Sequence, residues 1–166
     1  MDLEKKKIII LDDFLEESFI LKIRKRLNQN NISETWYKKE EKHSYHDICQ
    51  KFLQEVKNYY NISNFVGYEF WTQNNTRPSD WHYDKDENFF DSTGSYKFPI
   101  CSIVYYLNVN NLVGGLLHLE DCIILPKVNR LVIFPPGVIH YVEEFSGERT
   151  SILLNPWDYN LVSERL

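Results

Sequence analysis

Two histidines, one aspartate and one arginine are the residues of this chain whose types and spacing favour chemistry. His82 and Asp84 stand two residues apart in a strand-like segment, so both side chains project from one face. His140 lies much further along the chain, and Arg149 follows it nine residues later. Two imidazoles and one carboxylate on one side of a metal leave its other positions open, and this donor set suits Fe(II). The sequence therefore predicts an iron site at His82, Asp84 and His140.

Arg149 strengthens this interpretation, because a His-x-Asp tripeptide alone also fits a strand-end histidine that is hydrogen-bonded to its neighbour. Arg149 opens an apolar run that ends at Leu154, where a buried guanidinium is costly unless an anion partners it. Its planar fork suits a bidentate contact with a carboxylate, and Ser151 on the same strand face can donate one more hydrogen bond. Arg149 and Ser151 are therefore predicted to hold the carboxylate of a dicarboxylic co-substrate.

The ordered pattern resembles the 2-oxoglutarate- and Fe(II)-dependent dioxygenases, closest to their prolyl-hydroxylase-like branch. The segments Ile103–Asn108 and Gly114–Leu117 add to the resemblance, which covers roughly Tyr68 to Trp157. It implies a double-stranded β-helix, and an enzyme that consumes 2-oxoglutarate and O2 and releases succinate and CO2. Arg149 would then pair with the far carboxylate of 2-oxoglutarate, with help from Ser151 or Tyr106. Val104, on the same strand face as Tyr106, and Leu117 would line the co-substrate pocket.

The sequence departs from the family's pattern at two places. Leu116 stands after the paired glycines, where relatives often carry a glutamate. Some relatives also contact the co-substrate through a tyrosine on the strand before His-x-Asp. The candidates for that contact here are Tyr68, Phe70 and Thr72, whose register the sequence does not settle. Asp84 itself is present, which argues against the halogenase variant that leaves this ligand position open.

The fold class predicted is mainly β with flanking helices: a double-stranded β-helix of the jelly-roll type with two N-terminal helices packed on its outside. A first strand is expected at 7–11. A helix capped by Asp12 or Asp13 follows, and a second helix begins with a capping box at Ser44–Asp47. The apolar stripes of the helices are Leu15, Phe19, Ile23 and Leu27, then Ile48, Phe52, Val56 and Tyr60.

Seven further short runs rich in β-branched and aromatic residues are expected to be strands of the barrel. They are Val66–Gln73, Pro99–Leu107, Gly115–Leu119, Cys122–Leu125, Arg130–Phe134, His140–Phe145 and Arg149–Leu154. Turns are expected at 108–111, at Pro126, at 135–137 and at 146–147. Residues 85–97 do not fit a strand pattern, so they are expected to be a loop, either a lid over the substrate or a disordered insertion.

Other residues that attract attention have simpler explanations. His118, within an expected strand, is predicted to be a satisfied or solvent-facing histidine rather than a metal ligand. His43 and His46 have no carboxylate at metal-ligand spacing, although they lie near a helix start. The indoles of Trp71, Trp81 and Trp157 are expected to pack in the core or at its rim.

Length and charge limit the remaining possibilities. The 166 residues are predicted to form one domain, with supporting elements at 1–65 and the catalytic core at 66–157. The net charge of −5 gives no electrostatic reason to expect binding to nucleic acid or to a membrane surface. Three cysteines without a Cys-x-x-Cys spacing favour buried thiols, and a cytoplasmic location is expected.

The leading hypothesis is therefore an Fe(II)- and 2-oxoglutarate-dependent hydroxylase of a peptidyl, prolyl-type side chain or of a free amino acid. One alternative is a cupin-like barrel that binds a metal or a sugar without oxygenase chemistry. Another is a nucleic-acid demethylase on the same fold, which the acidic charge balance disfavours. The prime substrate and the oligomeric state cannot be read from the sequence.

Overall fold

The computed structural model describes residues 7–27, 31–74 and 78–161. The helices are α1 (Glu17–Leu27), α2 (His46–Val56) and α3 (Glu87–Thr93). The strands are β1 (Ile9–Leu11), β2 (Thr35–Lys38), β3 (Gly67–Asn74), β4 (Ser102–Gly114), β5 (Leu117–Leu119), β6 (Cys122–Ile124), β7 (Arg130–Phe134), β8 (His140–Val142) and β9 (Phe145–Trp157). Within these ranges, no helix has both the length and the apolar character needed to cross a lipid bilayer.

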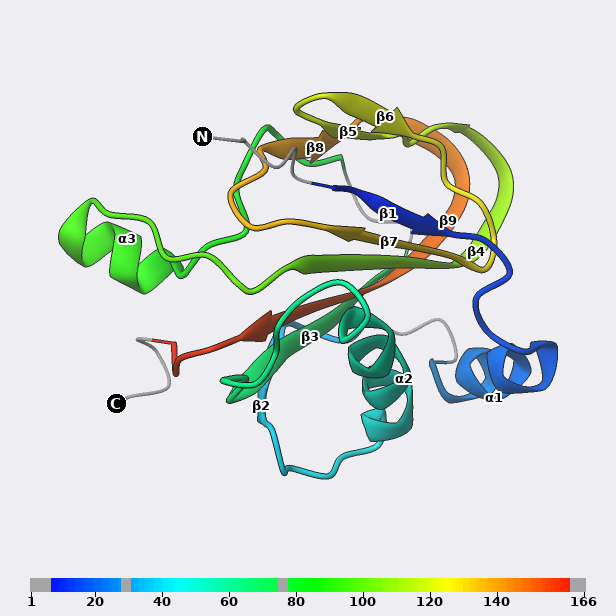
Figure 1. Cartoon of the computed structure of the whole chain (residues 1–166). Coiled ribbons are helices and arrows are strands. Elements are labelled where there is room, and N and C mark those ends of the chain that lie inside the picture. The colour runs from blue at the N-terminus through cyan, green and yellow to red at the C-terminus, as the bar shows by residue number, and fades with distance from the viewer. Residues whose placement is uncertain (1–6, 28–30, 75–77, 162–166) are drawn as a thin grey trace.

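The strands form two antiparallel sheets that face each other (Figure 1). The large sheet has the order β1-β7-β4-β9-β3-β2, and the small sheet has the order β6-β5-β8. The long strands β4 and β9 pair side by side and curve from the large sheet toward the small one. This is the predicted double-stranded β-helix, and the fold class is confirmed.

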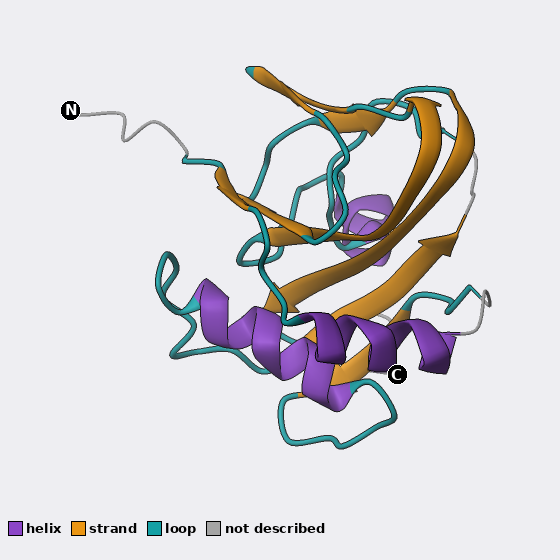
Figure 2. Cartoon of the chain, turned by 90° about the vertical axis from the view of Figure 1, so that its right-hand side faces the viewer, coloured by secondary structure: helices purple, strands orange, loops and turns teal. Residues whose placement is uncertain are grey.

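One face of the large sheet packs on α1 and α2, which lie on the same side of it (Figure 2). Alternate residues of each strand supply this core, because neighbouring side chains of a strand point to opposite faces. Phe52 of α2, for example, meets Tyr105 of β4 with ring centres 5.5 Å apart. Both helices were predicted to pack outside the sheet, and this is confirmed.

The opposite face of the large sheet is turned toward the small sheet and encloses a second, smaller apolar cluster. Val104 and Tyr106 of β4 contribute to it, although their neighbour Tyr105 belongs to the helix-side core. The remaining buried members are Leu117, Leu119, Ile124, Val132, Phe134 and Val138. The candidate co-substrate residues Val104, Tyr106 and Leu117 therefore lie inside the barrel.

Both predicted helix caps are wrong. Helix α1 begins at Glu17, too far from Asp12 for capping, and the Asp12 carboxylate instead accepts a 2.7 Å hydrogen bond from Arg130 Nε. Helix α2 starts after Tyr45, whose side chain makes no capping bond. Asp47 is held in a bidentate pair by Arg26, with distances of 2.8 and 2.7 Å. In both places the aspartate pairs with an arginine that is distant in the sequence instead of making the local capping bond that the sequence favours.

Two predicted turns are also wrong, because they lie inside paired strands. Residues 108–111 belong to β4 and residues 146–147 belong to β9. The register shifts between Asn110 and Val113, and Asn111 has a positive φ of 49°. Gly147 has φ 92°, and a Cβ there would lie 2.2 Å from the Asn111 carbonyl oxygen. The polar residues therefore accommodate a bulge rather than a reversal of the chain.

The segment 85–97, expected to be a loop, contains the short helix α3. The Asp86 carboxylate caps its start by accepting from Phe89 N at 3.0 Å, and Gly94 ends it at φ 70°. The Asp86 amide also bonds the Lys97 carbonyl at 2.9 Å, which closes the segment at its base. Tyr159 donates to the second Asp86 oxygen at 2.7 Å. This stretch is thus a folded helix rather than a disordered insertion, and its role as a lid stays a prediction.

Candidate functional site

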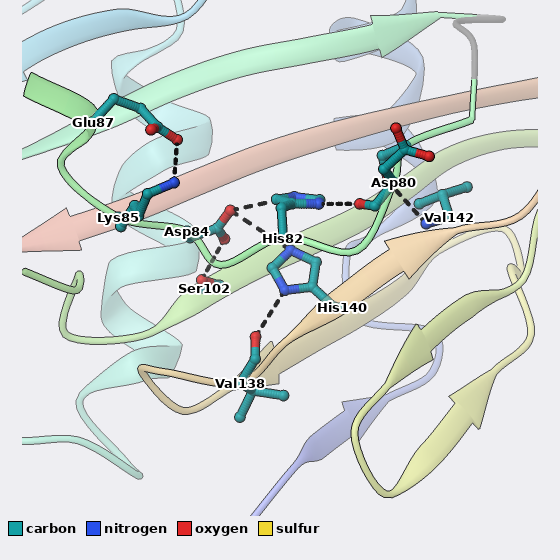
Figure 3. A network of polar contacts seen from close by, with 10 residues as sticks. Asp80, His82, Asp84, Lys85, Glu87, Ser102, Val138, His140 and Val142 are labelled. Atoms are coloured by element: carbon teal, nitrogen blue, oxygen red, sulfur yellow. Dashed lines mark hydrogen bonds and ion pairs between the residues drawn. The ribbon is translucent and has the colours of Figure 1, made fainter. Parts of the chain in front are cut away.

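His82, Asp84 and His140 come together at one end of the barrel (Figure 3). Their nitrogen and oxygen ligand atoms all lie within 4.8 Å of one another. His140 opens β8, and its backbone pairs with His82 through reciprocal hydrogen bonds of 2.9 and 3.0 Å. That pairing places the two imidazoles side by side, with ring centres 4.2 Å apart. Asp84 points into the same space, two residues beyond His82.

Backbone carbonyls orient both rings. The Nδ1 atom of His82 lies 2.7 Å from the Asp80 carbonyl oxygen, and that of His140 lies 2.9 Å from the Val138 carbonyl oxygen. A carbonyl oxygen only accepts, so each Nδ1 carries a hydrogen and donates it. The Nε2 atoms consequently face Asp84 Oδ1, at 3.8 Å for His82 and 3.6 Å for His140. Outer hydrogen bonds of this kind fix the ring orientation of metal-binding histidines.

The electrostatics of the group favour a bound cation. Burial works against the charged form of Asp84, yet the nearby His140 and the hydrogen bond from Ser102 keep the pKa of this carboxyl below its usual value. Burial likewise opposes a charged His140, but the Asp84 carboxylate raises the pKa of this histidine above its ordinary value. A metal ion would take the place of the proton on Nε2.

Ser102 holds the other oxygen of Asp84. Its Oγ donates to Asp84 Oδ2 at 2.6 Å, which leaves Oδ1 turned toward the two histidines. Ser102 is the first residue of β4 and is buried. The sequence analysis missed it, and the only available signal was a serine between Cys101 and Ile103 at the start of an apolar strand.

The residues present fit a first-row divalent metal. Two neutral imidazole nitrogens and one carboxylate oxygen suit Fe(II) better than they suit a structural zinc site, which is usually closed by four ligands. No thiol belongs to the group within the described ranges. Cys49 and Cys101 are buried in the helix-side core, as expected, whereas Cys122 is only half-buried. The assignment of the ligands stays a prediction.

A second polar group lies four residues further along the same face of β4. Tyr106 of β4 pairs directly with Ser151 of β9, and Arg149 precedes Ser151 on the same face. Arg149 is only 3% exposed, and its guanidinium carbon lies 5.2 Å from the centre of the Tyr106 ring and 5.8 Å from that of Phe145. A buried guanidinium between two aromatic rings is a site for an anion.

Two hydroxyl groups beside Arg149 are buried without a hydrogen-bond partner among the described residues. They are Tyr106 Oη and Ser151 Oγ. Burial raises the pKa of Tyr106 despite the opposing influence of Arg149, so the phenol stays a neutral donor. A buried polar atom without a partner costs about 1–3 kcal/mol, so both atoms point to a ligand that accepts hydrogen bonds.

The predicted apolar residues of this pocket lie where expected from strand alternation. Val104 is buried between Ser102 and Tyr106 on the interior face, and Leu117 of β5 belongs to the same cluster. Gly115 has φ 72°, and a Cβ there would lie 3.2 Å from Phe145 Cβ and 3.5 Å from Arg149 Cδ. The glycine therefore leaves room for the Arg149 side chain against Phe145. That these residues bind a co-substrate stays a prediction.

The candidates on β3 are wrong, because all three point away from the barrel. Tyr68 and Phe70 belong to the helix-side core, and Thr72 Oγ1 accepts from Ile32 N at 2.7 Å. The interior face of β3 carries the alternate residues Glu69, Trp71 and Gln73 instead. Gln73 pairs with Ser151, so it is the β3 residue beside the Arg149 group.

His118 has a partner of its own, as predicted, and His43 has one as well. His118 Nε2 lies 3.0 Å from Glu143 Oε2, and the His118 ring stacks on Tyr141. His43 Nε2 lies 2.7 Å from the Tyr68 hydroxyl. Neither histidine belongs to the metal-ligating group found in the described residues.

The sequence by itself matches no protein-family model and no curated protein. Solved structures are similar to it over nearly the whole chain. A prolyl 4-hydroxylase from Pseudomonas putida has a TM-score of 0.67 at 17% identity, with 96% of each chain covered. A viral collagen prolyl hydroxylase from Paramecium bursaria Chlorella virus-1, solved with 2-oxoglutarate, has a TM-score of 0.61 at 16% identity, with 92% of this chain and 97% of that chain covered.

A third solved structure is a prolyl hydroxylase from Trichoplax adhaerens in complex with a peptide fragment of the oxygen degradation domain of hypoxia inducible factor. It has a TM-score of 0.61 at 17% identity, and 94% of this chain and 86% of that chain are covered. At these identities the likeness concerns the course of the backbone rather than the side chains. The chain thus has the double-stranded β-helix fold that is also found in prolyl hydroxylases.

Proposed function

We propose that this protein is an Fe(II)- and 2-oxoglutarate-dependent dioxygenase that hydroxylates a peptidyl, prolyl-type side chain or a free amino acid. The observation that carries the proposal is the pairing of two groups on one interior face. Ser102 of β4 holds the metal-ligating Asp84, and Tyr106, four residues along the same strand, lies beside Arg149. Four strand residues span about 13 Å. A cation site and a buried anion site at this spacing favour a small dicarboxylate between them.

In this proposal His82, Asp84 and His140 hold Fe(II). When bound, the ion with 2-oxoglutarate and O2 supplies the oxidising power that inserts one oxygen atom into a substrate C–H bond, and succinate and CO2 are released. The protein's own contribution is positional. The carbonyls of Asp80 and Val138 keep both Nε2 atoms turned inward, and Ser102 keeps Asp84 Oδ1 available.

The co-substrate would be held by Arg149, Tyr106 and Ser151. A carboxylate at this position accepts hydrogen bonds from both orphaned hydroxyls and neutralises the buried guanidinium. Val104 and Leu117 pack beside it and exclude water, which strengthens each of these interactions. Fixing one end of the co-substrate in this way orients its other end toward the metal group.

A peptidyl substrate is supported by the fold. The similar Trichoplax enzyme is solved with a peptide fragment. In this chain α3 begins three residues after Asp84 (Figure 1), and a contact between this helix and a longer substrate is part of the proposal. A free amino acid is the second candidate, and the two differ in whether activity requires residues flanking the hydroxylated one.

The direct test is anaerobic addition of Fe(II) and then 2-oxoglutarate, followed by visible absorption. We expect the charge-transfer band of a chelated 2-oxo acid, and succinate release once O2 and an accepted substrate are added. Peptides and free amino acids are screened for substrate-dependent succinate. A protein that binds iron but never develops the band would be a metal-binding module of the cupin type, and the proposal would fail.

Arg149→Ala separates the two halves of the site. Iron content should stay at the wild-type level, while the 2-oxoglutarate concentration needed for the band rises by at least about tenfold, since lost bonds to a buried charge cost about 2–5 kcal/mol. Arg26→Ala is the matched control, because this arginine pairs with Asp47 on the helix side of the molecule. An unchanged 2-oxoglutarate requirement in Arg149→Ala would contradict the assigned role.

A further inference from the structure

A row of neighbouring residues across three strands of the large sheet, which we call a rung, runs from the metal group to a pair of carboxyl groups. Ser102, which donates to Asp84, directly precedes Ile103 of β4, and Asn155 directly follows Leu154, the β9 partner of Ile103. Asn155 in turn pairs directly with Glu69 of β3. Directly paired residues of antiparallel strands point to the same face, and neighbouring strands are about 5 Å apart. Glu69 therefore lies about 10 Å from Ser102, on the face that carries the metal group.

Asn155 has an unused hydrogen-bonding side chain. It is only 3% exposed, and its amide makes no hydrogen bond with any residue of the described ranges. By strand alternation it shares the interior face with Ser151 and Leu153. A buried amide costs free energy unless it finds a partner, so this position favours a polar ligand.

Glu69 and Glu34 form a carboxyl pair at the end of the same rung. Glu69 accepts a 2.9 Å hydrogen bond from Trp157 Nε1, and Glu34 lies close enough to influence the pKa of Glu69. Burial, then the neighbouring Glu34, raises the pKa of Glu69. Neither carboxylate has a lysine or arginine ion-pair partner among the described residues. The pair thus lacks the positive charge that would stabilise both ionised carboxylates.

Aromatic rings border this pair. Trp36 of β2 pairs directly with Glu69, and Trp71 lies two residues further along the same face of β3. Both indoles are partly exposed. Carboxylates flanked by indole rings form a typical recognition site for ammonium and guanidinium groups, through charge-assisted hydrogen bonds and cation–π contacts.

We propose that Glu69, Glu34 and Asn155 bind a positively charged nitrogen group of the substrate. The group is an alkylammonium or guanidinium held about 10 Å from the metal end of the rung. It comes either from a lysine or arginine side chain near the hydroxylated residue of a peptide, or from the α-ammonium of a free amino acid. This inference rests on the proposed function and specifies its substrate class.

Binding is measured anaerobically on the Fe(II)- and 2-oxoglutarate-loaded protein, by quenching of tryptophan fluorescence. The probes are capped proline-containing pentapeptides in matched pairs: lysine against acetyl-lysine, and arginine against citrulline. L-proline against N-acetyl-L-proline tests the α-ammonium. We expect the charged member of at least one pair to bind at least about tenfold tighter, and Glu69→Gln to abolish that difference while leaving affinity for the neutral member unchanged.

Two variants and the visible band make the outcome decisive. Glu34→Gln should weaken the preference in the same direction, and the exposed Glu120→Gln is the charge-matched control that should leave it intact. The pair that responds identifies the source of the cation. Equal binding of charged and neutral probes, no binding of any probe, or a preference that survives Glu69→Gln would overturn the inference. The charge-transfer band tests the proposed function independently of these binding measurements. Its absence would refute the proposed function rather than the cation site.

Discussion

The face of the large sheet that packs on α1 and α2 and the face turned toward the small sheet are built from alternate residues of the same strands. The helix-side face is a continuous apolar core in which Tyr68, Phe70 and Tyr105 are fully buried. The interior face combines an apolar cluster with Arg149, Ser102 and Asn155, all buried. Neighbouring residues of one strand point to different faces, so the register of a strand determines which side chains lie on each face.

The difference between the faces separates stability from chemistry. On the helix side the buried residues form one large apolar cluster, which stabilises the folded state. On the interior side Tyr106 Oη and Ser151 Oγ are buried without partners, which destabilises the ligand-free protein. Polar groups that are unsatisfied until a ligand binds are typical of a preorganised site. Variants on the two faces should therefore affect different measurements.

The largest effect is expected for His140→Ala. Removing one of three ligands should abolish stoichiometric iron binding and succinate release, because two remaining ligands do not hold the ion in place. Unfolding of the metal-free protein should change much less than it does for a core variant. Metal analysis and urea denaturation measure the two quantities, and succinate release at the wild-type rate would contradict the metal assignment.

Phe52→Ala tests the opposite face. Truncating this fully buried ring, which contacts Tyr105, should lower the free energy of unfolding by about 3–5 kcal/mol. At a temperature where the variant stays folded, its affinity for 2-oxoglutarate should equal that of the wild type. Urea denaturation provides the first value, with the exposed Ile123→Ala as a control that changes stability by less than about 0.5 kcal/mol.

Ser102→Ala should have an intermediate effect confined to the metal. Asp84 Oδ2 loses its 2.6 Å hydrogen bond, so the carboxylate is less well oriented and metal affinity should fall about 10–100-fold. Competition with a metal chelator measures this affinity. The comparison between faces would break down if the variant lost stability as much as Phe52→Ala does while binding metal normally.

Tyr106→Phe should change stability and binding in opposite directions. The phenol hydroxyl has no partner in the ligand-free protein, so its removal should raise the free energy of unfolding, by up to about 1 kcal/mol. Affinity for 2-oxoglutarate should fall about fivefold, since one hydrogen bond is lost. Thermal unfolding with and without 2-oxoglutarate tests both signs, and a variant destabilised in both conditions would show that the hydroxyl is structural.

The last prediction concerns pH and Glu69. Burial and the neighbouring Glu34 raise the pKa of Glu69 in the folded protein above the 4.5 of a free glutamate. Above about pH 4.5 the Glu69 carboxyl loses its proton in the unfolded chain but keeps it in the folded protein. Glu69 therefore lowers the free energy of unfolding as the pH rises. Glu69→Gln cannot lose a proton and should therefore be more stable than the wild type at about pH 8, with little difference at about pH 4. Urea unfolding at both pH values measures the difference, and equal curves at the higher pH would contradict the shift.

The sequence could predict those features that depend on near neighbours. Alternation placed His82 and Asp84 on one face, and helical spacing identified Ile48, Phe52 and Val56 as buried. Strand β7 was predicted with its observed bounds, Arg130–Phe134. Local signals failed where a distant residue competed with them. Asp12 binds Arg130 instead of capping a helix, and the polar residues 108–111 form a bulge against β9.

What the sequence by itself determined about this protein is the set of chemical groups, their order and the barrel of short strands that carries them. Only the tertiary structure decided which face of β3 is turned toward the barrel interior, which carbonyls orient His82 and His140, and that Asn155 pairs with Glu69. The physical reason is that the alternation of side chains between the two faces of a strand can be read from adjacent residues. Its register depends on hydrogen bonds with strands far away in the chain, and shifting it by one residue turns every side chain to the other face.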